Sequence, residues 1–112
     1  ADRSRAIVVL KGDDSLVAAP GGPVAISPGA APGLATAGTG DVLSGLIAAL
    51  LAKGLEPFSA AAAGVLAHVR AGQAAARRLG ADHTIATDVI EDVPAALGGR
   101  RCGGRRRERG RG

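Results

Sequence analysis

The chain has 112 residues, with one aromatic side chain, one cysteine, no methionine and a net charge of +4. A single cysteine excludes an internal disulfide and a structural metal site built from cysteines alone, and it fits a reducing compartment. No apolar run approaches the ~20 residues that a membrane span needs, and no secretory signal opens the sequence. We therefore expect a cytoplasmic protein that does not enter a membrane.

The positive charge is concentrated at one end of the sequence. Residues 100–112 hold seven Arg and one Glu, a net charge of +6, so that residues 1–99 carry a net charge of −2. We interpret residues 98–112 as a disordered Gly/Arg-rich tail, because they contain nothing that could form a core, and residues 1–97 as the folded part. Any affinity for nucleic acid would be weak and would belong to the tail.

Short apolar segments rich in β-branched residues predict three strands. Residues 6–10 (AIVVL) are typical of a buried strand, and residues 15–19 and 24–27 are typical of two more strands joined by the turn PGGP. The second and third strands would form a hairpin. Residues 28–40 contain two prolines and four glycines, which predicts a loop.

The spacing of apolar residues predicts two long helices and a third, short one. The first begins near Gly40 or Asp41 and ends at Gly54, and the second extends over residues 57–79 with a proline in its first turn. The third begins around Asp88, which we expect to cap it. The apolar face expected for the second helix comprises Phe58, Ala62, Val65, Leu66, Val69, Ala76 and Leu79. The glycines expected to permit close backbone approach are Gly45, Gly64 and Gly72.

This order of elements indicates an α/β fold, with short strands and a hairpin followed by two long helices. The strands are too few to form a complete sheet beneath these helices. The sequence also begins at Ala1 without a methionine. Both observations favour a fragment of a larger domain.

The segment LATAGTGDVLSG, residues 34–45, places glycines and one carboxylate against the start of an apolar helix. A helix N-terminus has unpaired N–H groups and a partial positive charge, and glycines let a ligand approach those groups closely. Gly38, Thr39 and Gly40 are therefore a candidate anion hole for a phosphate or for a phosphoryl group in transfer. Asp41 is a candidate base for the hydroxyl that is phosphorylated. Capping of the helix by Asp41 is the alternative.

Two longer segments carry a family resemblance. PGLATAGTGDVLSGLIAALLAKGLEPFSAAAAGVLAHVRAG, with VVLKGDDSLVAAPGGPVAIS upstream, resembles the ADP/ATP-dependent NAD(P)H-hydrate dehydratases, a branch of the ribokinase-like superfamily. The resemblance covers about residues 7–97 and implies the C-terminal fragment of a three-layer α/β/α domain. It also implies an enzyme that phosphorylates the added hydroxyl of hydrated NADH or NADPH, with ADP or ATP as co-substrate. Elimination of phosphate would then restore the nicotinamide ring.

The resemblance also implies roles for particular residues. Asp41 would contact the hydrate and act as the base, and Gly40 with the preceding amides would meet the nucleotide phosphates. The nucleotide would also be bound by the segment that matches the family's Lys-Gly turn, namely Lys11, Gly12, Asp13, Asp14 and Ser15. Mg²⁺ would bridge the phosphates, with no metal site made by the protein alone. The full-length protein would form a homo-oligomer, and these 112 residues alone would not catalyse.

Two positions depart from the family pattern. Ala31 stands where the family usually has Asn before Pro-Gly, and Gln73 stands where an acid often follows glycine in the second helix. Two other functions remain open. One is a related kinase of a thiazole or pyrimidine alcohol, which would leave the phosphoryl group on its product, and the other is RNA binding through the tail. We expect His68 to be a satisfied structural histidine and His83 to be a loop residue.

Overall fold

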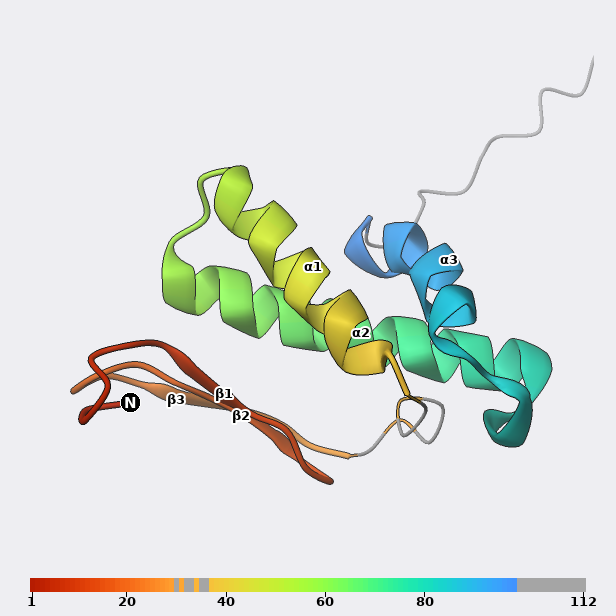
Figure 1. Cartoon of the computed structure of the whole chain (residues 1–112), viewed down its shortest axis with the longest axis horizontal. Coiled ribbons are helices and arrows are strands. Elements are labelled where there is room, and N and C mark those ends of the chain that lie inside the picture. Colours follow the sequence, from red (N-terminus) through yellow and green to blue (C-terminus); the bar gives the residue numbers. More distant parts are fainter. Residues whose placement is uncertain (30, 32–33, 35–36, 99–112) are drawn as a thin grey trace, which may run out of the picture.

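Three short strands are followed by three helices in a computed structural model that describes residues 1–29, 31, 34 and 37–98 (Figure 1). The predicted Gly/Arg-rich tail therefore lies outside the described residues, apart from Gly98. The elements are β1 (Val8–Leu10), β2 (Ser15–Ala18), β3 (Val24–Ser27), α1 (Thr39–Ala52), α2 (Pro57–Leu79) and α3 (Ala86–Leu97), with a 3₁₀ turn, η2, at Ala81–His83 between α2 and α3. The predicted order of strand, hairpin and helices is confirmed.

The strands form one antiparallel sheet in the order β1-β2-β3, so the predicted hairpin of β2 and β3 is correct. Val17 of β2 pairs with Val9 of β1 and with Ala25 of β3, and these three residues face the helices. Val17 is 2% exposed and lies at the centre of this inner face.

A strand is found within residues 6–10, at Val8–Leu10, but the expectation that it is buried is wrong. Val8 is 37% exposed and Leu10 is 61% exposed. Successive side chains of a strand point to opposite faces, and in the described part of the chain helices cover only the face that carries Val9. Val24 and Ile26 of β3 share the uncovered face with Leu10 and are exposed as well. One face of the sheet is therefore apolar and open.

α1 begins at Thr39, one or two residues before the predicted start. Leu43, Leu46 and Leu50 recur at helical spacing and are buried. The predicted glycine at the C-terminal end is confirmed, because Gly54 has φ of +91° and its N–H donates to the carbonyl of Leu51.

α2 has the predicted bounds, and its N-terminus is capped by a side chain that sequence reasoning missed. The carboxylate of Glu56 accepts hydrogen bonds from the N–H groups of Phe58 and Ser59, at 2.9 and 3.0 Å. These bonds favour the charged form and lower the pKa of Glu56. None of the helices in the described part of the chain combines the length and the apolar character needed to cross a membrane.

The buried face of α2 consists mostly of alanine and glycine, and the predicted apolar face is partly wrong. Leu66 is 44% exposed and Leu79 is 37% exposed, although both were expected on that face. Val65 and Val69 are buried as expected, and the other buried residues of the helix are Ala60, Ala61, Gly64, Ala67, His68, Ala71, Gly72 and Ala75. The first half of this helix packs against the sheet and α1, and the second half packs against α3. Small side chains let these neighbours approach the helix closely.

Two of the three glycines expected at close contacts are found there. A Cβ placed on Gly64 would lie 2.6 Å from Cγ1 of Ile47 in α1, and one placed on Gly72 would lie 2.5 Å from Cγ of Leu34. Gly45 contradicts the expectation, since a Cβ placed on it would have nothing within 4 Å, and the residue is exposed on α1.

α3 begins at Ala86 and not at Asp88. The carboxylate of Asp88 accepts a hydrogen bond from the N–H of Ile85 at 2.9 Å, so Asp88 acts from inside the first turn and does not occupy the cap position. Val89 is fully buried against α2. Pro94 lies within the last turn, where the helix continues to Leu97.

The glycine contact between α1 and α2 gives a first testable prediction. Gly64→Ala should lower the free energy of unfolding by about 1 kcal/mol, because overpacking costs ~1–3 kcal/mol and the gain in helix propensity is only ~1 kcal/mol. Gly45→Ala is the matched control and should raise stability by up to ~1 kcal/mol, since the position is open. Urea unfolding followed by far-UV circular dichroism measures both. A Gly64→Ala variant as stable as the native chain would contradict the close packing.

Candidate active site

The start of α1 has a glycine at its cap position. Gly38 has φ of +88°, in the left-handed region that suits glycine, and it has no side chain with which to cap the helix. The N–H groups of Asp41 and Val42 donate to the carbonyl of Gly38, at 3.1 and 3.3 Å. Gly40 is exposed in the first turn. The positive end of the helix is therefore accessible around Gly40.

Thr39 differs from its two glycine neighbours in the predicted anion hole. Thr39 is 3% exposed, and its hydroxyl donates a hydrogen bond to the carbonyl of Leu34 at 2.7 Å. Its side chain is directed inward and ties the start of α1 to Leu34. Any contribution of Thr39 to anion binding would come from its backbone.

Gly38 also lies directly against the start of α3. A Cβ placed on Gly38 would lie 3.3 Å from the Cβ of Ala86. Both its backbone conformation and this neighbour therefore favour glycine at position 38.

Lys11 and Gly40 line the same cavity, although they come from distant parts of the sequence. The cavity has a volume of ≈ 550 Å³ and lies between β1 and α1. Ser44, one turn beyond Gly40 on α1, lines it too, and its hydroxyl donates to the carbonyl of Gly40 at 3.0 Å. The structure thus brings together a cation and a helix N-terminus from the two segments singled out in the sequence.

The rest of the Lys-Gly turn is less closely associated with Gly40. Gly12 and Asp13 are exposed, and the carboxylate of Asp14 accepts a hydrogen bond from the N–H of Gly29 at 2.8 Å. Ser15 is 9% exposed and lines a separate cavity of ≈ 220 Å³ between the sheet and α2. Asp14 thus has a structural partner in the loop after β3, and of the five turn residues Lys11 alone lines the cavity that Gly40 lines.

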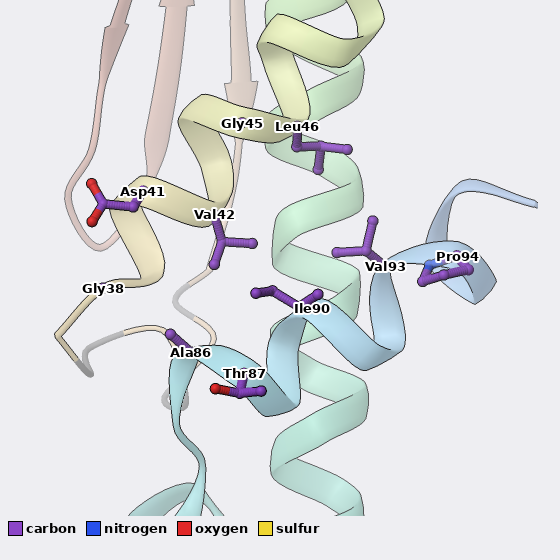
Figure 2. A pocket seen from close by; sticks show the side chains of 10 residues that line it. All are labelled: Gly38, Asp41, Val42, Gly45, Leu46, Ala86, Thr87, Ile90, Val93 and Pro94. Carbon is purple, nitrogen blue, oxygen red and sulfur yellow. The ribbon is translucent and has the colours of Figure 1, made fainter.

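A third cavity, of ≈ 600 Å³, lies between α1 and α3 and is mainly apolar. Figure 2 shows Val42 of α1 facing Ile90 and Val93 of α3 across it, whereas the carboxylate of Asp41 at its rim points away from α3. Thr87, next to Ala86 at the start of α3, also lines this cavity. Nothing in the sequence indicated that α3 would meet α1 across such a space.

Asp41, the candidate base, has a carboxylate that is accessible at the start of α1. It is exposed, lies in the first turn next to Gly40, and forms no ion pair or side-chain hydrogen bond within the described part of the chain. An available carboxylate and an exposed amide therefore share the N-terminus of α1. No group of three His, Cys, Asp or Glu residues that could hold a metal ion occurs among the described residues.

His68 is not the fully satisfied histidine that was expected. It is 1% exposed on α2, and its Nε2 atom has no hydrogen-bond partner in the described structure. Burial lowers the pKa of His68, and the nearby charge of Lys11 lowers it further, whereas a hydrogen bond with the backbone of Thr39 acts in the opposite direction. His83 is exposed in η2, in the stretch expected to be a loop.

These features define an α/β protein in which a glycine-rich helix N-terminus shares a cavity with a lysine and carries an exposed carboxylate in its first turn, features suited to phosphoryl-group chemistry. A family model described as NAD(P)H-hydrate dehydratase, of the carbohydrate kinase type, matches residues 1–95. The chain belongs to this family. This match confirms the family that the sequence resembles and the predicted ribokinase-like α/β fold class.

Individual relatives agree with the family model. The chain is 41% identical over 97 residues to an ADP-dependent (S)-NAD(P)H-hydrate dehydratase of Xanthomonas campestris. It is 45% identical over 93 residues and 46% identical over 110 residues to bifunctional NAD(P)H-hydrate repair enzymes of Moorella thermoacetica and Salinibacter ruber. These matches cover 87%, 83% and 95% of this chain.

The chain is much shorter than these relatives. It spans 34% of the Xanthomonas protein, 18% of the Moorella protein and 20% of the Salinibacter protein. No solved structure gives a significant match.

The contact of Gly38 with Ala86 gives a second testable prediction. Gly38→Ala should lower the free energy of unfolding by more than Gly54→Ala. Each substitution forces alanine into the left-handed region, which costs ~1–2 kcal/mol, but only position 38 adds a tight contact. Chemical unfolding of the two variants measures the difference. Equal losses of stability would show that the start of α3 does not constrain position 38.

Proposed function

We propose that this chain supplies the phosphate-binding end and the catalytic base of an ADP-dependent NAD(P)H-hydrate dehydratase. The observation that carries the proposal is the exposed start of α1, where Gly40 lines one cavity with Lys11 and the next residue, Asp41, carries an exposed carboxylate. The names of the relatives support the substrate class, and the name of the Xanthomonas relative supports ADP as the co-substrate.

The nucleotide would bind on the side of α1 that faces β1. There the ammonium group of Lys11 would attract the phosphates as a point charge, and the amide of Gly40 would donate to a phosphate oxygen. The backbone amides of Gly38 and Thr39 would complete the anion hole. The remaining nucleotide contacts would come from Gly12, Asp13, Asp14 and Ser15.

Asp41 would act on the hydroxyl of the hydrate. Its carboxylate would accept the hydroxyl proton while the oxygen attacks the terminal phosphoryl group of ADP, so that AMP leaves and a phosphorylated hydrate forms. In the second step the carbon–oxygen bond would break, the phosphate would leave with the bonding electrons, and loss of a neighbouring proton would regenerate the reduced nicotinamide ring. Asp41 is the described carboxylate closest in sequence to the Gly40 amide, which suits this role.

A divalent cation would accompany the nucleotide. Mg²⁺ is commonly held by substrate phosphates, waters and one or two carboxylates, and the described residues contain no cluster of three ligating side chains. The ion would therefore be held mainly by the phosphates and by water. The ion would neutralise charge that develops on the phosphoryl oxygens. A homo-oligomeric full-length enzyme belongs to the same proposal.

A chimera tests the proposed function directly. Residues 1–97 would replace the matching segment of the Xanthomonas dehydratase, with which this chain shares 41% identity over 97 residues. We expect the chimera to restore the NADH absorbance of the hydrate when ADP is present and to release inorganic phosphate. The unaltered Xanthomonas protein is the positive control, and omission of ADP is the negative control. A chimera that is folded by circular dichroism but leaves the hydrate unchanged, while its parent is active, would overturn the proposal.

A substitution of the proposed base makes the prediction specific to one residue. Asp41→Asn in the chimera should reduce turnover by ~10²–10⁴-fold, because a positioned general base contributes about that much. Binding of ADP should stay within a few-fold, since the Gly40 amide and Lys11 are retained. Single-turnover kinetics and calorimetric titration with ADP measure the two quantities. Full turnover by the Asn variant would exclude Asp41 as the base.

A further inference from the structure

Leu34, which precedes α1 in the sequence, rests directly on a glycine of α2. A Cβ placed on Gly72 would lie 2.5 Å from Cγ of Leu34 and 2.6 and 3.0 Å from its two Cδ atoms. The leucine side chain therefore occupies the space that any side chain at position 72 would need. Glycine inside a helix is unfavourable compared with alanine, and this contact accounts for its presence at position 72.

The backbone of Leu34 is bonded on both sides. Its carbonyl accepts a hydrogen bond from the hydroxyl of Thr39 at 2.7 Å, and its N–H donates to the carbonyl of Ala31 at 2.8 Å. Thr39 is 3% exposed and Ala31 is buried as well. Because the bond from Thr39 is shielded from water, it is electrostatically stronger than an exposed bond of the same geometry.

These contacts connect α2 to the first residue of α1. The side chain of Leu34 rests on Gly72, and the hydroxyl of Thr39, where α1 begins, is bonded to Leu34. A conventional cap side chain would accept hydrogen bonds from the N–H groups at the helix start, which are the groups that an anion needs. Thr39 donates its hydroxyl proton to a carbonyl of another segment. It therefore stabilises the helix start by a bond that leaves the N–H group of Gly40 to a ligand.

We propose that Thr39 is a positioning residue for the phosphate-binding start of α1, which its hydroxyl anchors to α2 through Leu34. The inference rests on the proposed function only for the identity of the ligand. The group that the anchor positions is the amide of Gly40, the next residue in the chain. Donors that are fixed before the ligand arrives bind it more tightly, since no ordering of the backbone then opposes binding.

Two substitutions at position 39 separate the hydrogen bond from the packing of the side chain. Thr39→Val keeps the volume and removes the hydroxyl, whereas Thr39→Ser keeps the hydroxyl and removes a methyl group. Hydrogen exchange in the 112-residue chain is followed at the first-turn amides of Asp41 and Val42, with the amide of Leu50 as the reference near the other end of α1. We expect about tenfold faster exchange at Asp41 and Val42 in the Val variant, because the carbonyl of Leu34 loses its buried donor. The Ser variant should keep rates close to native.

The order of the two variants decides between anchoring and space filling. If Thr39 only fills space, the Ser variant will exchange faster than the Val variant, and that order would overturn the proposal. Exchange at Leu50 that accelerates as much as exchange in the first turn would overturn it too, since the whole of α1 would then be opening.

A substitution on α2 tests whether the anchor acts through Leu34. Gly72→Ala places a methyl group where the leucine side chain lies, so exchange at the first-turn amides should be faster than in the native chain. Adding Leu34→Ala gives this methyl group room, and the rates should then return toward native. Gly45→Ala, at an open position of α1, is the matched control and should not accelerate exchange. Native rates in the single Gly72→Ala variant, or no recovery in the double variant, would contradict the proposal.

Binding of ADP provides a readout that packing alone would not change. Calorimetric titrations are made on the chimera with the same two substitutions at position 39. We expect the Val variant to bind ADP about tenfold more weakly, and the Ser variant to bind within a few-fold of the unsubstituted chimera. Equal affinities of the Val variant and the unsubstituted chimera would overturn the proposal. Failure of the unsubstituted chimera to bind ADP would count against the proposed function, while the exchange rates of the native chain would still decide the role of Thr39.

Discussion

The close approach of other elements to one side of α2 determines where everything else in this structure lies. Ala71 and Ala75 are fully buried against α3, and Gly64 has no room for a methyl group beside α1. A helix with larger residues on this side would hold both neighbours farther away, and the start of α1 would then be displaced. The site therefore depends on a helix that contributes almost no side chain to it. With one aromatic residue in the whole sequence, close backbone packing replaces bulk as the source of dispersion energy.

Most of the elements could be predicted from the sequence, because the signals are local. Pro57 and Gly54 mark helix ends, and the bounds of α2 and β3 agree with the residues chosen from the pattern. The exposure of individual residues could not be predicted equally well. Leu10 belongs to a strand whose outer face has no covering layer among the described residues, and Leu66 belongs to a helix that buries alanine in preference to leucine. Whether a leucine is covered depends on which neighbours exist, and no local pattern contains that information.

The candidate site was predicted in part for the same reason. The glycines before α1 and the carboxylate of Asp41 are local features, and they lie where the sequence placed them. The proximity of Lys11 to Gly40 followed from the resemblance and could not be derived from spacing. The inward orientation of Thr39 and the bond between Asp14 and Gly29 were not foreseen, since each depends on a partner from another segment.

The proximity of Gly38 and Ala86 limits which residue can precede α1. A Cβ added to Gly38 would lie 3.3 Å from the Cβ of Ala86, at the point where α1 and α3 both begin. A side chain at position 38 would therefore act on two helices at once, because it would press against the first residue of α3 and strain the left-handed backbone before α1. The glycine thus serves the seating of α3 as well as access to the N–H groups of α1.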